Sequence, residues 1–158
     1  VWCVLYAEIF LNMEPFSAKS PEIKQILLEG YKKLFSQANI EQGNADKSSF
    51  VKQFVQSMNQ QSAVAAAGLN AETLTMIRTR FILHWSATAK GYPYALFDYQ
   101  QQLLREGMFD AYNQWLFGSV QNLAAYQGWT NIHADENRAF YNFQKTRVFK
   151  VPEKQYYH

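Results

Sequence analysis

Apolar residues recur at three- and four-residue spacing in two adjacent runs within residues 94–126, joined at 105–107. This spacing gathers apolar side chains on one helix face, and so short a connection forces two helices to lie antiparallel. Pro93 and Gly107 stand where helices favour a first-turn proline and a left-handed end. We predict a helical hairpin with facing residues Leu96, Tyr99, Leu103 and Leu104 on one side and Phe109, Tyr112, Trp115, Leu116, Val120 and Leu123 on the other.

Runs with the same spacing flank the hairpin and predict further helices, with clear start and stop signals. Asn70 is a strong N-cap, with Leu69 and Leu74 at the positions of a hydrophobic staple. Gly30 lies inside a helical run, where it allows a neighbour to approach closely. The predicted helices cover residues 1–13, a run that begins at Ser20, 50–58, 70–90, the hairpin closed by Gly128, and 134–148.

These patterns predict an all-α fold of about seven helices, packed as antiparallel helical hairpins in a bundle or short right-handed superhelix. No linker divides the chain, so we expect one helical domain over 1–158, with a basic aromatic tail at 147–158. The start at Val1 suggests that the N-terminus is truncated or processed. The most buried side chains should include Leu74, Ile77, Phe81, Leu103, Tyr112, Trp115 and Leu116.

Gly107 followed by Phe109 at the start of the second helix resembles the helix-turn-helix unit of tetratricopeptide and related α-solenoid repeats. Tyr112 and Gln100 stand where that family carries small residues, and no second copy of the unit is visible in the chain. The resemblance covers residues 94–126. It implies a concave surface that binds an extended peptide or a partner helix.

Composition excludes a disordered chain, because 48% of the 158 residues are apolar and only 18% are charged. Cys3 is the one cysteine, so no intrachain disulfide can form, which favours a reducing compartment. We therefore predict a cytoplasmic protein, with a periplasmic protein, or one anchored in a membrane through a segment upstream of Val1, as the alternative. The apolar run 1–13 is shorter than the roughly 20 residues that span a bilayer.

Candidate chemistry is sparse, and we predict no catalytic residue, metal site or cofactor, so that a non-enzymatic role is favoured. His84 and His133 lack further ligands at metal-binding spacing, and no phosphate-binding loop or nucleophile elbow occurs. Glu8 sits in an apolar run, either on an exposed stripe or as a buried acid. The basic end 138–154 alternates with aromatic residues, which we interpret as a solvated helix face rather than a nucleic-acid site.

The clearest functional signal is the surplus of aromatic residues, of which the chain has 26. Phe97 and Phe117 fall outside the predicted packing faces. The hairpin is then either sandwiched in the middle of the domain or exposes an aromatic groove. We predict a helical interaction module that docks a protein or peptide partner. The predicted binding residues are Phe97, Phe117, Trp129, Arg105 and Lys90.

The alternative is a helical ligand-binding domain, in which the surplus aromatic residues line a pocket for a small apolar molecule. Outward-facing aromatic side chains on a concave surface would favour the interaction module, and a closed aromatic cavity would favour the ligand-binding domain. The oligomeric state stays open at this point.

Overall fold

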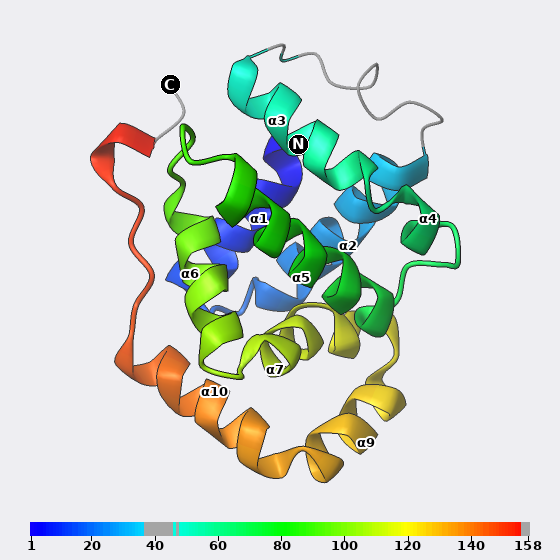
Figure 1. Ribbon diagram of the computed structural model, residues 1–158. Coiled ribbons are helices and arrows are strands. Elements are labelled where there is room, and N and C mark those ends of the chain that lie inside the picture. The colour runs from blue at the N-terminus through cyan, green and yellow to red at the C-terminus, as the bar shows by residue number, and fades with distance from the viewer. Residues whose placement is uncertain (37–45, 47, 156–158) are drawn as a thin grey trace.

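Helices are the only regular elements in the computed structural model, which describes residues 1–36, 46 and 48–155 (Figure 1). The all-α prediction is confirmed for that part of the chain. The elements are α1 (Trp2–Met13), α2 (Ser20–Ser36), α3 (Ser49–Asn59), α4 (Ser62–Ala65), α5 (Ala71–Thr88), α6 (Ala95–Arg105), α7 (Phe109–Asn113), the π-helical turn η1 (Gln114–Gly118), α8 (Ser119–Gln121), α9 (Leu123–Ile132), α10 (Ala134–Thr146) and the 3₁₀ turn η2 (Glu153–Gln155).

Helix α5 runs through the middle of the fold and contacts α3, α4, α6, α7 and η1 (Figure 1). It begins where the sequence predicts, because Asn70 and Thr73 form a reciprocal capping box, each accepting a backbone N–H at 2.9 Å. Its apolar residues Leu74, Ile77 and Phe81 are at most 1% exposed. Burial of apolar side chains against five neighbouring elements makes α5 the main contributor to the core.

Helices α1 and α2 pack against each other, and Gly30 sits at their contact. A Cβ atom added at Gly30 would lie 2.8 Å from Cγ1 of Val4, closer than real carbon contacts allow. The close approach predicted for this glycine is therefore confirmed.

The turn of the predicted hairpin is also confirmed. Gly107 has a φ of +71°, and two hydrogen bonds close the end of α6: Met108 N–H to Leu103 C=O at 2.9 Å and Gly107 N–H to Leu104 C=O at 3.3 Å. This pair of bonds is the Schellman motif, which satisfies carbonyls that a helix end leaves without partners.

The second helix of the hairpin is not continuous, and the prediction of one run to residue 126 is wrong. It passes through η1 and α8 and then breaks at Asn122, whose backbone is extended at φ −157° and ψ 101°. The Asn122 side chain accepts the N–H of Ala125 at 3.0 Å and so begins α9. Gly128 consequently lies inside α9 instead of closing a helix.

Six of the seven side chains predicted to be most buried are at most 1% exposed: Leu74, Ile77, Phe81, Leu103, Tyr112 and Leu116. Trp115 is the exception, since it is only partly buried. The ammonium nitrogen of Lys24 lies 4.3 Å from the centroid of the Trp115 ring, so the indole is covered by a charged side chain at the edge of the core. Burial also lowers the pKa of Lys24 to about 8.

The aromatic surplus is mostly absorbed by the core, which corresponds to the sandwiched alternative for the hairpin. Phe97 is 4% exposed and Phe117 is 0% exposed. The C-terminal segment closes over α6: Phe149 is buried against Tyr99, and Gln155 accepts the N–H of Ala95 at 2.7 Å. Residues 156–158 of the predicted tail lie outside the described residues. Within the described chain, none of the helices combines the length and the apolar character that crossing a bilayer requires.

Candidate functional site

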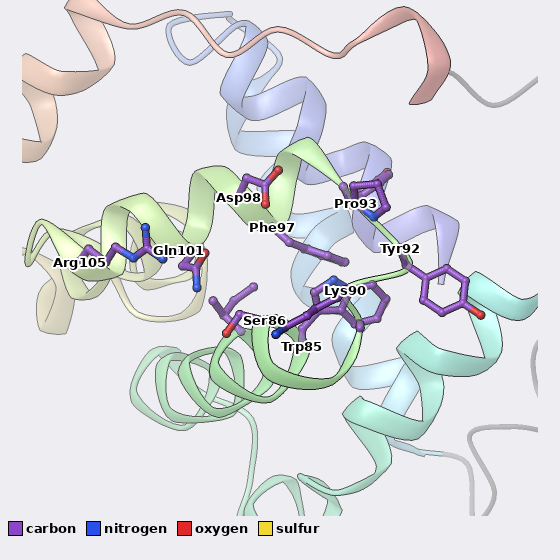
Figure 2. Close-up of a pocket in the computed structure, with 12 residues that line it drawn as sticks. Trp85, Ser86, Lys90, Tyr92, Pro93, Phe97, Asp98, Gln101 and Arg105 are labelled. Atoms are coloured by element: carbon purple, nitrogen blue, oxygen red, sulfur yellow. The ribbon is translucent and has the colours of Figure 1, made fainter.

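A hollow of about 340 Å³ lies along α6, beside the C-terminal end of α5 and the connection between the two helices. Figure 2 shows the side chains that line it. We call it the α5–α6 pocket. Aromatic and aliphatic side chains form its floor, and charged or polar side chains form its rim. The floor includes Ile82, Trp85 and Phe97, and the rim includes Ser86, Lys90, Asp98, Gln101 and Arg105.

The local sequence explains why a hollow forms here. Helix α5 ends at Thr88, and the Tyr92 N–H donates to the Ala89 carbonyl at 2.9 Å, which turns the chain back. Pro93 disfavours helical geometry in the residue before it, and Tyr94 is extended at φ −145° and ψ 115°. The short irregular connection 89–94 thus separates the two helix ends. Its backbone borders the pocket that they leave between them (Figure 2).

The rings of the floor pack in T-shaped or tilted contacts within the core. The centroid of the Phe97 ring lies 4.8 Å from that of Trp85, 5.0 Å from that of Tyr94 and 5.1 Å from that of Phe81. Such geometries are favoured by the quadrupoles of aromatic rings. Phe97 and Trp85 are 4% and 5% exposed, so a bound group would contact only their edges.

The rim carries two cations and one acid. Lys90 and Arg105 are exposed and form no ion pair with any described residue. Both lie at C-terminal helix ends, where the helix dipole favours cations: Lys90 comes two residues after α5, and Arg105 is the last residue of α6. With Asp98 as the single acid of the lining, the pocket has an excess of positive charge.

The five predicted binding residues fall into three places. Lys90, Phe97 and Arg105 all line the α5–α6 pocket. Phe117 lies in η1, with its ring centroid 5.7 Å from that of Tyr31, and a partner has no access to a side chain that is 0% exposed. Its expected surface position is therefore corrected, because the π-helical turn changes the helical phase and directs the ring into the core.

Trp129 lies on α9 in a different hollow, at the N-terminal end of α5. Its indole is partly buried and stacks on the His133 ring at a centroid distance of 4.5 Å. The sequence did not indicate that Trp85, Asp98 and Gln101 join the α5–α6 pocket. The one local signal that could have indicated this place is Trp85 near the end of a predicted helix, followed by a connection that contains Gly91 and Pro93.

A buried polar network forms the second chemically unusual region, and it resolves the two alternatives for Glu8. The Glu8 side chain is buried and ion-paired with Arg78, which donates to it through Nη2. The same carboxylate oxygen accepts the Tyr112 hydroxyl and the Gln100 amide, each at 2.6 Å. Glu8 and Arg78 are each 1% exposed, so this network belongs to the core.

His84 and His133 lie in ordinary environments. His84 Nε2 is 3.4 Å from the amide nitrogen of Gln60, and His133 Nδ1 is 3.7 Å from a carboxylate oxygen of Glu136. Across the described residues, no three or more His, Cys, Asp or Glu side chains are grouped so that they could hold a metal ion.

Comparison with known proteins gave no match to any protein-family model, curated protein or solved structure. The tetratricopeptide-like resemblance of residues 94–126 therefore stays a prediction. Any assignment of function to this chain rests on the geometry of its own residues.

Proposed function

We propose that this chain is a non-enzymatic interaction module, and that the α5–α6 pocket docks a peptide segment of a protein partner. The observation that carries the proposal is the combination of an aromatic floor with two rim cations that lack ion-pair partners among the described residues. An apolar or aromatic side chain of the partner would rest on the edges of Trp85 and Phe97. An adjacent carboxylate would lie between Lys90 and Arg105.

Charge and shape favour a peptide over a small apolar molecule. A pocket for an apolar ligand is expected to enclose it with apolar walls, whereas Lys90, Asp98 and Arg105 are exposed around this one. The exposed rim leaves room for a chain to enter and leave the pocket on either side of an anchoring side chain. Interface energy concentrates in a few such anchors, with aromatic residues and arginine enriched among them.

The test is a selection of peptides from a random displayed library on the immobilised protein. We expect enrichment of an aromatic or large aliphatic residue beside Asp, Glu or a free C-terminal carboxylate. The double variant Lys90→Glu, Arg105→Glu should lose those peptides by at least about tenfold in affinity, because like charges then face each other. The variant should select basic peptides in their place.

Lys52→Glu is the matched control, because Lys52 is exposed on α3 and does not line the pocket. It should leave the selected peptides unchanged. Selection of the same peptides by the double variant would overturn the proposal. If no peptide class is enriched while neutral aromatic compounds such as indole raise the melting temperature, the pocket serves a small apolar ligand and the peptide proposal is wrong.

A further inference from the structure

A second hollow of opposite charge lies at the other end of α5 and is lined by residues of α5, α7, η1 and α9. It consists of two adjoining pockets of about 210 Å³ and 200 Å³ that share Glu72, Gln114 and Trp129. We call this the α5–α9 groove. Asp110 of α7 and Tyr126 of α9 also line the groove.

Two carboxylates give the groove its negative charge. Glu72 and Asp110 are exposed and form no ion pair in the part of the chain that the structure describes. Each lies in the first turn of its helix, Glu72 in α5 and Asp110 in α7, and the helix dipole favours acids there. The dipole explains why acids occur at these positions, but it does not explain a polar side chain that lines the groove together with them.

That side chain is Gln114, which lines both pockets of the groove. Gln114 is 8% exposed, and its amide makes no hydrogen bond with any described residue. Its polar atoms are not fully enclosed and reach solvent at the groove, where water can satisfy the amide in the free protein. The Gln114 carbonyl is therefore an acceptor available to a donor that enters the groove.

Gly118 makes room for this arrangement. A Cβ atom added there would lie 2.6 Å from Oε1 of Gln114 and 2.8 Å from Cδ2 of Tyr126. Any larger residue at this position would displace the amide or the ring. The absence of a side chain at Gly118 thus keeps the acceptor at the edge of the groove.

Trp129 supplies an aromatic surface to the same groove. His133 covers one face of the indole, with an angle of 13° between the two ring planes, and the partly buried indole lines both pockets. An indole is the aromatic side chain that attracts cations most strongly. Two carboxylates, an acceptor amide and an indole are together complementary to a cation that also donates hydrogen bonds.

We infer that the α5–α9 groove binds the side chain of a lysine or arginine carried by a basic segment of a protein partner. An alkylammonium or guanidinium group would donate to the Gln114 carbonyl, lie between Glu72 and Asp110, and contact the Trp129 ring. The Trp129 ring would also pack against the aliphatic stem of such a side chain. This inference uses none of the residues that line the α5–α6 pocket, so it can be tested independently of the function proposed for that pocket.

The experiment follows the indole N–H resonance of Trp129 by ¹H–¹⁵N NMR, with the resonance assigned from Trp129→Phe. The probes are acetylated and amidated alanine peptides with one central lysine or arginine, the same peptide with norleucine, and free n-butylammonium. We expect a saturable shift with the lysine and arginine peptides, and none with norleucine. Because both carboxylates are exposed, added salt should weaken the binding.

The double variant Glu72→Gln, Asp110→Asn keeps the shapes of both side chains and should weaken binding of the basic peptides by at least about fivefold. Glu22→Gln, an exposed acid in the first turn of α2, is the matched control and should not change the affinity. The inference is overturned by an equal shift with norleucine or by unchanged affinity in the double variant. Equal affinity for butylammonium and the peptides overturns the protein partner in favour of a small amine.

Discussion

At the scale of single residues, the unusual feature is a charged pair in the centre of the core. Arg78 is enclosed by aromatic rings: those of Tyr112 and Phe117 have centroids 5.3 Å from its guanidinium carbon, and that of Phe109 lies at 5.6 Å. Its second terminal nitrogen, Nη1, donates to Oδ1 of Asn113 at 2.6 Å. Burial alone would lower the pKa of Arg78, but the Glu8 carboxylate together with Tyr31 and Tyr112 outweighs burial and raises the pKa above its ordinary value.

Arg78→Met should reduce the free energy of unfolding by about 3–5 kcal/mol, because Glu8 is then left charged in the core without its cation. Adding Glu8→Gln to this variant should recover part of that loss, since the double variant no longer carries a buried charge. Urea unfolding of the wild type, both single variants and the double variant measures the coupling between the two residues.

Arg80→Met is the control for the same change on the exposed side of α5, and its effect should stay within about 0.5 kcal/mol. An effect of Arg78→Met no larger than that of Arg80→Met would contradict the role of the pair. The sequence left two alternatives for Glu8 because its partner is 70 positions away. Periodicity reports which face a residue is on, but it does not report which distant side chain meets it.

At the scale of elements, the sequence predicted the structural features that depend on neighbours within one helical turn. It did not predict the features that depend on packing between helices. The capping box at Asn70 and the left-handed residue at Gly107 involve neighbours only, and both are present. The π-helical turn η1 was missed, because its Gly118 depends on the ring of Tyr126 packing against it from α9. The break at Asn122 had a local signal in the sequence, an asparagine before an apolar run. The apolar periodicity continues across this position and so concealed the break.

Gly107→Ala should destabilise the protein by about 1 kcal/mol, because a residue with a Cβ atom is strained at a φ of +71°. Gly91→Ala is a matched control, since both glycines follow helix ends and neither would bring a Cβ within 4 Å of another atom. Gly91 does not have a positive φ, so its substitution should be neutral or slightly stabilising. Thermal unfolding of the two variants would contradict the argument if they lost equal stability.

At the scale of the whole molecule, the aromatic residues gather from distant helices into one core. Phe50 of α3, Trp85 of α5 and Phe97 of α6 pack together. Tyr112 of α7 packs against Phe140 of α10. Composition showed the surplus of aromatic residues, but it could not show which rings lie in the core and which lie at the surface. Three of the five predicted binding residues share the α5–α6 pocket, because Phe97 and Arg105 lie on one face of α6 and Lys90 lies in the connection that precedes it. The α5–α9 groove draws on four elements, a combination that no local pattern contains.

Burial of tyrosine side chains in this aromatic core makes the stability of the folded protein sensitive to alkaline pH. Burial raises the pKa of Tyr31, Tyr94, Tyr99 and Tyr112 above the ordinary value of a tyrosine. Above a pH of about 10 the unfolded chain releases these protons while the folded protein retains them. The folded state then binds more protons than the unfolded state, so its stability is complete below that pH and falls as the pH rises further.

Tyr94→Phe isolates one of these contributions, because the buried Tyr94 hydroxyl has no hydrogen-bond partner among the described residues. At pH 7 the substitution should leave the free energy of unfolding unchanged or raise it, since it removes a buried polar group without breaking a bond. Between pH 9 and pH 11 the variant should gain about 1 kcal/mol relative to the wild type, because it lacks one group whose ionisation favours the unfolded chain. Urea unfolding followed by circular dichroism across this range measures the difference. A difference between the two proteins that stays constant with pH would mean that the Tyr94 hydroxyl ionises equally well in the folded and unfolded states, and that the aromatic core at this point is open to water.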